Sequence, residues 1–221
     1  MLWTRCKPCA RFMVRWATVG AATVAVALVV FTGAIEAGIL RYNVSASMPE
    51  GLYAIMPRRL GFGVGSWVAV CVPPAVERFA RRRRYLDTGS CRGGGAPLLK
   101  VVVAVGPARL RLLHGRLTVD RVSVPGCGSR LARDSEGRPL PFVPPPADLR
   151  AGDVYLCGLS PRSYDSRYFG AVPSRGILGR AIPLWAQVGA PGVVNRMDNA
   201  TARISEAVLN KRIGKHEKSR S

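Results

Sequence analysis

Hydrophobic positions divide the chain into one long apolar run and many short ones after it. The long run, residues 16–35, contains no charged side chain. As a helix, about 20 residues span about 30 Å, the thickness of the hydrocarbon core of a bilayer. Because a cleavable signal peptide has a shorter apolar core, we expect a retained membrane anchor. A buried core helix is the alternative, but no second run of comparable apolarity follows to pack with it.

Beyond this run the hydrophobic pattern changes to short, alternating or β-branched segments bounded by Gly and Pro. Such segments predict strands, here over residues 52–56, 67–72, 98–105, 109–113, 116–119, 154–157 and 177–183. Residues 113–116 predict a hairpin turn, with Gly115 supplying the positive φ that the turn needs. One helix is expected over residues 74–86, because Pro suits a first helical turn. Its arginine run at 81–84 predicts a solvated face, and the prolines at 139–146 predict a loop.

These elements predict a mainly β protein with one N-terminal transmembrane helix. We expect a basic tail over residues 1–15, the anchor over residues 16–40, a β domain over residues 41–194, and a basic segment over residues 195–221. The last segment could form an amphipathic helix or fray, and we assign it no role.

The distribution of charge along the chain predicts its orientation in the membrane. The 221 residues carry a formal net charge of +20, and their 48% hydrophobic content excludes a wholly disordered basic arm. Residues 1–15 hold four basic side chains and no acidic one. By the positive-inside rule, the N-terminus is expected in the cytoplasm and the bulk of the chain outside. No nucleic-acid-binding motif accompanies the charge, so we expect no nucleic-acid partner.

The cysteines follow the same division. Cys6 and Cys9 form a lone C-x-x-C in the expected cytoplasmic tail, which is a weak metal or redox signal without a second pair. The other four lie in the expected external domain, where disulfides are permitted. Three pairings are possible, and the spacing does not choose among them; the four residues are Cys71, Cys91, Cys127 and Cys157.

The sequence offers few histidines for catalysis or metal binding. The chain has two histidines, His114 in the expected turn and His216 in the polar C-terminal segment, so a Ser-His-Asp hydrolase is not expected. A zinc site with several histidines is excluded, and we expect neither metal nor cofactor. Lysine can replace histidine as a general base if burial lowers the pKa of its amine toward neutrality.

Lys100 is the candidate for such a base. Of 33 basic residues only five are lysines, and Lys100 alone lies between the two ends of the chain. It occurs in the apolar run Leu-Leu-Lys-Val-Val-Val, where an arginine could not serve because it does not deprotonate. A snorkelling lysine at a strand end is the alternative interpretation.

Three short sequence motifs, one of which contains Lys100, occur in a fixed order along the chain. Ser45-Ala-Ser47-Met-Pro follows the anchor, the Leu-Leu-Lys strand leads to Val-Gly-Pro at residues 105–107, and Ser163-Tyr-Asp165-Ser-Arg167-Tyr-Phe-Gly comes later. With a late Gly-Arg-Ala at residues 179–181, this ordered set resembles the type I signal peptidase family, whose members are serine proteases with a Ser-Lys dyad. The resemblance covers about residues 16–185. It implies a signal-peptidase-like β catalytic domain hung from one transmembrane helix.

Within that family the chain is most similar to the TraF-type conjugative transfer peptidases, which mature a pilin subunit. Ser-Met-Pro-x-Gly-Leu-Tyr at residues 47–53 and the stretch at residues 91–100 carry this likeness. Gly-Leu-Ser at residues 158–160 stands where the housekeeping enzymes have Gly-Asp-Asn. These enzymes also often carry a large inserted β domain and a second anchor. The implied substrate is the propilin of a conjugative system rather than secretory preproteins in general.

The resemblance also implies a role for each residue. Ser47 would be the nucleophile and neutral Lys100 its general base, while the Ser45 hydroxyl and the Ser47 N–H would stabilise the oxyanion. Ser163 would hold the Lys100 amine. Asp165 and Arg167 would form a supporting ion pair, for which an ordinary turn salt bridge is the alternative.

The expected setting is the bacterial inner membrane, with the catalytic domain in the periplasm. Ser47 follows the apolar run closely, so the nucleophile would lie near the membrane face, and an extended substrate would bind as a strand. The implied partners are a precursor protein and the membrane. Two other functions compete with propilin processing: a general type I signal peptidase, and a noncatalytic membrane-anchored pilus assembly factor. A Ser-Lys repressor autoprotease would need a DNA-binding head in place of the anchor.

Overall fold

The computed structural model describes residues 7–187 together with Ala202 and Glu206. Apart from these two residues, the basic segment at 195–221 lies outside the described residues, and so does Cys6. The chain divides after Arg41 into an N-terminal unit and a second, β-rich unit. We describe each unit by itself.

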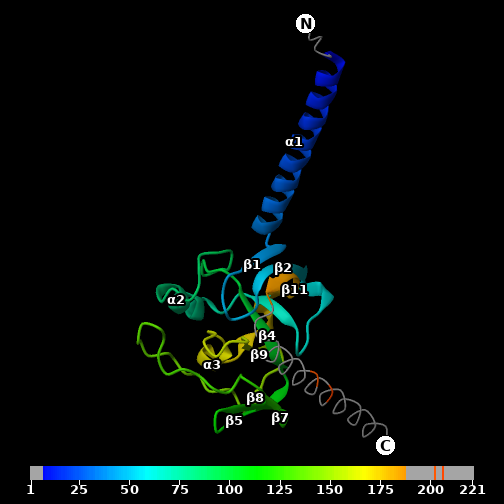
Figure 1. The fold of residues 1–221 in the computed structure, drawn as a ribbon. Coiled ribbons are helices and arrows are strands. Elements are labelled where there is room, and N and C mark those ends of the chain that lie inside the picture. Colours follow the sequence, from blue (N-terminus) through cyan, green and yellow to red (C-terminus); the bar gives the residue numbers. More distant parts are fainter. Residues whose placement is uncertain (1–6, 188–201, 203–205, 207–221) are drawn as a thin grey trace, which may run out of the picture. The chain divides into compact units, whose positions relative to one another are not determined.

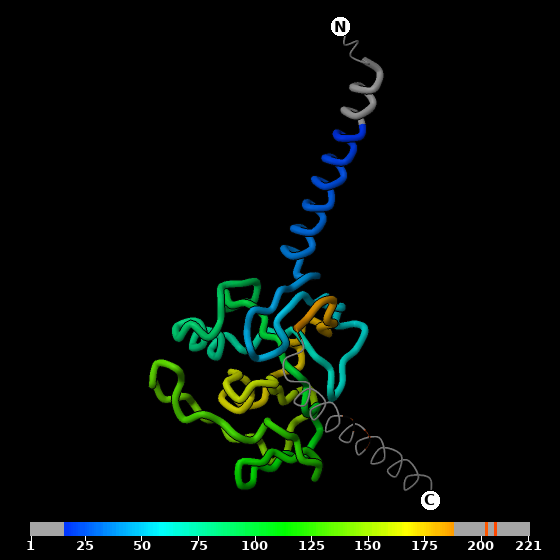
Figure 2. Tube along the Cα trace, viewed as in Figure 1, coloured from blue at the N-terminus to red at the C-terminus, as the bar shows by residue number. Residues whose placement is uncertain are grey.

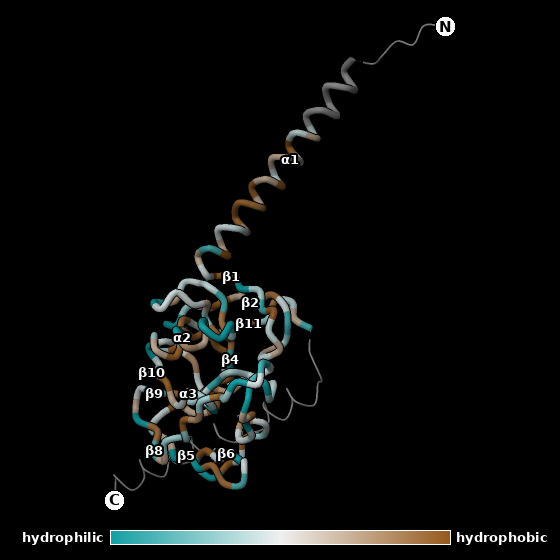
Figure 3. The backbone as a smooth tube through the Cα atoms, turned by 90° about the vertical axis from the view of Figure 1, so that its left-hand side faces the viewer, coloured by the Kyte–Doolittle hydropathy of each residue, from teal (hydrophilic) through white to brown (hydrophobic). Residues whose placement is uncertain are grey.

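The N-terminal unit contains helix α1 (Lys7–Glu36). Its part from Trp16 to Glu36 has a mean hydropathy of 2.1, and none of this apolar stretch is buried among the described residues. Figure 3 shows the apolar colouring along this helix. The Thr23 and Thr32 hydroxyls donate to carbonyls one turn back at 2.9 Å, which satisfies them without an external partner. The helix is long and apolar enough to cross a membrane and fits an anchor or a signal sequence.

The described strands form two sheets. The larger sheet has seven strands in the order β1-β2-β11-β3-β4-β9-β10, and the smaller has four in the order β7-β6-β5-β8. The strands of the larger sheet are β1 (Leu40–Asn43), β2 (Glu50–Pro57), β3 (Trp67–Val70), β4 (Leu98–Val105), β9 (Asp153–Cys157), β10 (Val172–Pro173) and β11 (Ile177–Gln187). Those of the smaller are β5 (Ala108–Leu113), β6 (Arg116–Val119), β7 (Val122–Val124) and β8 (Asp148–Leu149).

The two sheets occupy opposite ends of the β-rich unit. Figure 1 shows β5, β7 and β8 at one end and β2 and β11 at the other, and the rotated view agrees. In Figure 2 the orange strand β11 lies against the cyan strand β2, its antiparallel partner from far away in the sequence. The prediction of a mainly β protein with one N-terminal apolar helix is therefore confirmed.

The seven expected strands are all present, and the 98–105 prediction coincides with β4. The β5–β6 hairpin turns at His114 and Gly115, with φ values of 48° and 70°, as the expected turn requires. Strands β1, β7, β8 and β10 were not expected; β7, β8 and β10 have only two or three residues, which is too short for a periodicity to appear. Residues 140–146 form no strand or helix, consistent with the expected proline-rich loop.

The helices are shorter than the pattern predicts. Helix α2 (Pro74–Arg82) ends four residues before the expected boundary at 86, since Arg84 adopts a positive φ of 57°. Of the expected solvated face, Arg81, Arg82 and Arg84 are exposed. Arg83 is half-buried and lies over the Phe79 ring. The remaining helical segments are short: α3 (Ser166–Phe169) and two 3-10 turns, η1 (Arg58–Leu60) and η2 (Ser174–Gly176).

Strand β4 is the centre of the core. Every side chain from Leu99 to Ala104 is at most 5% exposed. Odd-numbered positions such as Val101 pack into one hydrophobic cluster, and Val102 packs into another on the opposite face of the sheet. This burial on both faces explains the continuous apolar run in the sequence.

Candidate active site

The Ser-Ala-Ser-Met-Pro loop between β1 and β2 is held by one buried side chain, Asn43. The Asn43 amide donates to the carbonyls of Ser45 at 2.9 Å, Met48 at 2.9 Å and Pro49 at 3.0 Å. Its Oδ1 accepts a hydrogen bond from the Ser45 hydroxyl at 3.0 Å. One amide thus satisfies several loop groups that a short connection cannot pair by itself.

Ser47 belongs to the loop that Asn43 holds. Ser47 is half-buried, and its carbonyl accepts a hydrogen bond from the Leu159 N–H at 2.8 Å. In the part of the chain that the structure describes, neither its hydroxyl nor its N–H has a protein partner. Both groups therefore remain available to a bound molecule.

Lys100 lies in the middle of the sheet, opposite Val68 of β3. The side chain is 1% exposed and makes neither a hydrogen bond nor an ion pair with any described residue. Burial lowers the pKa of its amine from 10.5 to about 8, with the Asp165 carboxylate opposing this shift and the Arg167 guanidinium adding to it. This lysine is therefore neutral in an appreciable fraction of molecules near physiological pH.

Ser47 and Lys100 line the same cavity, which has a volume of about 520 Å³. Ser45 also lines it. Further along, the wall consists of three aromatic rings and of a segment that runs from residue 131 to 140; the rings are Tyr85, Tyr164 and Tyr168. The sequence boxes that lie far apart along the chain thus converge on one space.

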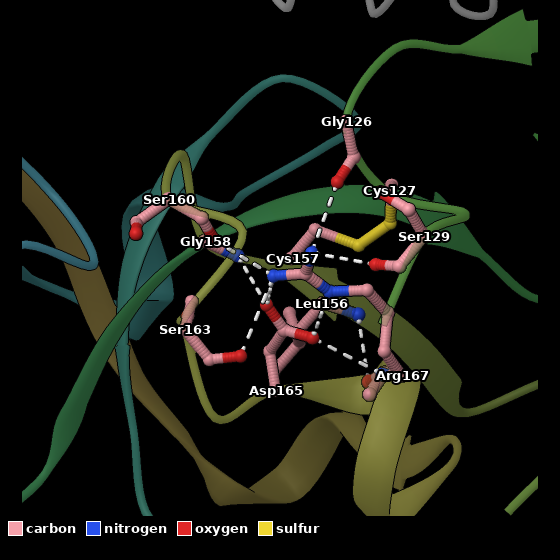
Figure 4. The surroundings of a disulfide bond; sticks show 11 residues. Gly126, Cys127, Ser129, Leu156, Cys157, Gly158, Ser160, Ser163, Asp165 and Arg167 are labelled. Atoms are coloured by element: carbon pink, nitrogen blue, oxygen red, sulfur yellow. Dashed lines mark hydrogen bonds and ion pairs between the residues drawn. A yellow bond between two sulfur atoms is a disulfide. The ribbon is translucent and has the colours of Figure 1, made fainter. Parts of the chain in front are cut away.

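Asp165 and Arg167 form a buried bidentate ion pair beside this cavity (Figure 4). The Arg167 Nε and Nη2 atoms lie 2.8 and 2.6 Å from the two Asp165 oxygens, and both side chains are at most 2% exposed. Although burial alone lowers the pKa of an arginine, contact with Asp165 holds the pKa of Arg167 above its ordinary value.

The remaining donors of Arg167 bind backbone carbonyls from two loops. Its Nη1 donates to Gly126 and Ser129, and its Nη2 donates to Ser160 (Figure 4). Asp165 in turn accepts a hydrogen bond from the Gly158 N–H at 2.8 Å. The pair therefore ties together the loops that flank the cavity, which an ordinary turn salt bridge would not do. Removing one partner of such a buried pair typically costs about 3–5 kcal/mol.

Gly158 and Ser163 are packed against each other without room for a larger residue. A Cβ at Gly158 would overlap the Ser163 hydroxyl and crowd the Ser47 carbonyl at 3.0 Å. The hydroxyl oxygen of Ser163 is buried and has no hydrogen-bond partner among the described residues. Gly158 directly follows Cys157, which pairs with Val101, the neighbour of Lys100. An unpartnered hydroxyl therefore lies next to the strand position that carries the buried amine.

Two disulfides brace the surrounding loops. Cys71 is bonded to Cys91 and Cys127 to Cys157, which selects one of the three pairings left open by the sequence. The second disulfide joins the loop that Arg167 holds to strand β9, next to Gly158 (Figure 4). Within the described residues, no group of three or more His, Cys, Asp or Glu side chains is arranged to hold a metal ion.

The structure thus brings all six predicted site residues to one region: Ser45, Ser47 and Lys100 on the cavity wall, and Ser163, Asp165 and Arg167 buried behind it. Two contributors to the site, Asn43 and Gly158, were not predicted from the sequence. Asn43 stands two residues before the Ser-x-Ser box. An Asn this close to a short loop can hydrogen-bond the loop backbone, and this is the sequence signal that could have revealed its role. Gly158 was noted only as a departure from a family pattern.

Comparison with known proteins identifies the family of this chain. A family model described as signal peptidase, peptidase S26, matches residues 12–185. A probable conjugal transfer protein TraF of Sinorhizobium fredii is 40% identical over 73% of this chain and 85% of its own length. A conjugal transfer protein TraF of Agrobacterium fabrum is 38% identical over 72% of this chain and 92% of its own. A plasmid transfer protein TraF of Escherichia coli is 31% identical over 66% and 82%, respectively. The chain therefore belongs to the peptidase S26 signal peptidase family, and its relatives include conjugal transfer proteins.

Proposed function

We propose that this chain is a membrane-anchored serine endopeptidase that uses a Ser-Lys dyad to cleave the precursor segment of an exported protein. The observation that carries the proposal is that Ser47 lines the same cavity as the buried Lys100, whose amine has no hydrogen bond or ion pair among the described residues. A buried lysine without a counter-ion destabilises a fold, so its retention is best explained by a need for a neutral amine.

The proposed reaction follows from these positions. The Lys100 amine takes the proton of the Ser47 hydroxyl, whose oxygen attacks the scissile carbonyl, and the proton then passes to the leaving amine. Water later attacks the acyl-enzyme with Lys100 again as base. The Ser47 N–H, which has no protein partner among the described residues, would donate to the oxyanion. The Ser45 hydroxyl would join it after turning away from Asn43 Oδ1.

Two further groups would position the base. The unpartnered Ser163 hydroxyl supplies a hydrogen bond for the Lys100 amine once the amine is neutral. Asp165 and Arg167 would fix the loop that carries Ser163, and their role is orientation rather than proton transfer. We also propose that α1 anchors the chain in the bacterial inner membrane, with the N-terminus in the cytoplasm and the β-rich unit in the periplasm.

The rate of acylation should depend on pH through the pKa of Lys100. With that pKa at about 8, the neutral amine falls roughly tenfold for each pH unit below that value. We expect the acylation rate of Ser47 to rise from pH 6 to about pH 8 and to level off above it. Labelling rates measured from pH 6 to 9.5 test this. A rate that is constant across the range would show that Lys100 does not act as the base.

The substrate we propose is the propilin of a conjugative transfer system, because the relatives at 38–40% identity are named conjugal transfer proteins. Membranes containing the chain would be incubated with such a propilin and, in parallel, with an ordinary secretory preprotein. We expect the propilin to be shortened and the preprotein to stay intact. Cleavage of both would indicate a general signal peptidase. Cleavage of neither, together with an unreactive Ser47, would indicate a noncatalytic assembly factor.

A further inference from the structure

The cavity that contains Ser47 and Lys100 has an uneven distribution of charge. Among the described residues that line it, the charged types are Lys100, Arg133, Asp134 and Arg162. If their charges cancelled, the cavity would suit a neutral peptide. Whether they cancel depends on the partner of each charged side chain.

The negative charge is fully compensated. Asp134 accepts hydrogen bonds from the Tyr85 hydroxyl and from the Arg138 Nε at 2.7 Å, and Arg83 lies 3.9 Å away. Although its burial opposes ionisation, these contacts keep the pKa of Asp134 well below its ordinary value. Its carboxylate is thus ionised and already paired with arginines. It serves to fasten the 131–140 segment to Tyr85 and adds no free negative charge to the cavity.

The positive charges of the two cavity arginines are not compensated. Arg162 is exposed, and within the described part of the chain its guanidinium has neither an ion pair nor a hydrogen-bond acceptor. Arg133 donates to the Gly137 carbonyl at 2.6 Å, which positions its guanidinium but leaves its charge in place. The cavity therefore carries two free positive charges beside a dyad whose lysine is largely neutral above pH 8.

Arg162 stands on the loop that contacts the catalytic serine. Leu159 of this loop donates to the Ser47 carbonyl at 2.8 Å, and Ser163, the residue after Arg162, packs against Gly158. The Ser163 N–H donates a hydrogen bond to the Ser160 carbonyl at 3.1 Å, which closes a turn in this loop. The guanidinium is thus carried by a braced loop close to the reacting atoms.

We propose that Arg162, supported by Arg133, determines substrate specificity by binding an acidic side chain within a few residues of the scissile bond. This inference rests on the proposed endopeptidase function. A guanidinium can bind a carboxylate through two parallel hydrogen bonds, which rewards Asp or Glu over the matching amide. Because Arg162 is exposed, solvent weakens the pair, and we expect a preference for Glu over Gln of about 2- to 5-fold in kcat/KM.

The test uses the full chain in detergent micelles and pools of synthetic peptides. The pools carry Glu, Gln or Lys at one of the four positions on either side of a randomised centre, and mass spectrometry locates the cuts. Arg162→Gln should remove the preference for Glu, and Arg162→Glu should reverse it in favour of Lys. The matched control is Arg111→Glu, which changes an exposed arginine on β5 of the smaller sheet and should leave the preference intact.

Acylation of Ser47 by a β-lactone probe is measured on every variant to separate selectivity from catalysis. Normal acylation of Arg162→Glu with an unchanged preference for Glu would overturn the specificity inference and leave the peptidase standing. Labelling of Ser47 without cleavage of any acidic pool would overturn it as well. Neither labelling nor cleavage by the wild-type chain would overturn the proposed peptidase, and this inference with it.

Discussion

Ser47→Ala is expected to lower precursor cleavage by at least about 10⁴-fold, the order of loss seen when a serine protease loses its nucleophile. Ser47 is half-buried and its hydroxyl bonds no described residue, so the substitution removes the reacting oxygen and no structural contact. Expression, membrane insertion and thermal stability should therefore stay as in the wild type. Cleavage is measured by incubating membranes with the propilin and following the shortened product.

Ser123→Ala is the matched control for this experiment. Ser123 is exposed on β7 of the smaller sheet, and its hydroxyl takes no part in the proposed site. This variant should cleave at the wild-type rate. Full cleavage by Ser47→Ala would eliminate the dyad, whatever the remaining variants did.

Lys100→Arg should be as damaging as Lys100→Ala, with a loss of about 10²- to 10⁴-fold in the acylation rate. The reason is that the site requires a group that can accept a proton, and arginine cannot. A merely electrostatic role would be kept by the arginine, so the two substitutions separate charge from proton transfer. Burst kinetics of acylation give the rate directly, and an active Lys100→Arg variant would refute the general-base role.

Because a buried arginine can prevent folding, Lys100→Met provides a second, independent measurement. The Lys100 pKa is about 8 in the folded chain against an ordinary 10.5, so the unfolded chain binds more protons between these values. Wild-type stability then rises with pH across this window, and below about pH 8 the full penalty of about 3 kcal/mol is present. Lys100→Met should therefore be inactive but more stable at pH 7, with a gain that shrinks toward pH 10.5. Denaturant unfolding of the detergent-solubilised chain would measure it, and a less stable Met variant would indicate a structural role for the amine.

The sequence predicted the central elements of the site because its key residue breaks a compositional pattern. One lysine within an apolar strand is visible without any structure, and the burial of β4 on both faces accounts for that strand being apolar throughout. The longer strands of the larger sheet, β2, β3, β4, β9 and β11, were predictable for the same reason, since buried strands leave continuous or alternating apolar runs. Helix α2 was predicted too long, because the positive φ of Arg84 that follows its end has no local sequence signal.

The parts of the site that were missed depend on contacts between distant segments. Tyr85 and Asp134 are 49 residues apart, and only the folded chain shows that they join the 131–140 segment to the cavity. The disulfide pairing was open for the same reason, because spacing alone does not bring Cys127 to Cys157. Asn43 acts within its own loop, but its three hydrogen bonds follow from the path of the backbone rather than from any periodicity.

The central claim is that a neutral Lys100 activates Ser47. It is tested most directly by mass spectrometry of the full-length chain after incubation at pH 8.5 with a β-lactone acylating probe. We expect one acyl adduct on the peptide that contains Ser47, lost in Ser47→Ala and strongly slowed in Lys100→Met. An unmodified Ser47 in the wild type, or an adduct that forms equally fast in Lys100→Met, would contradict it.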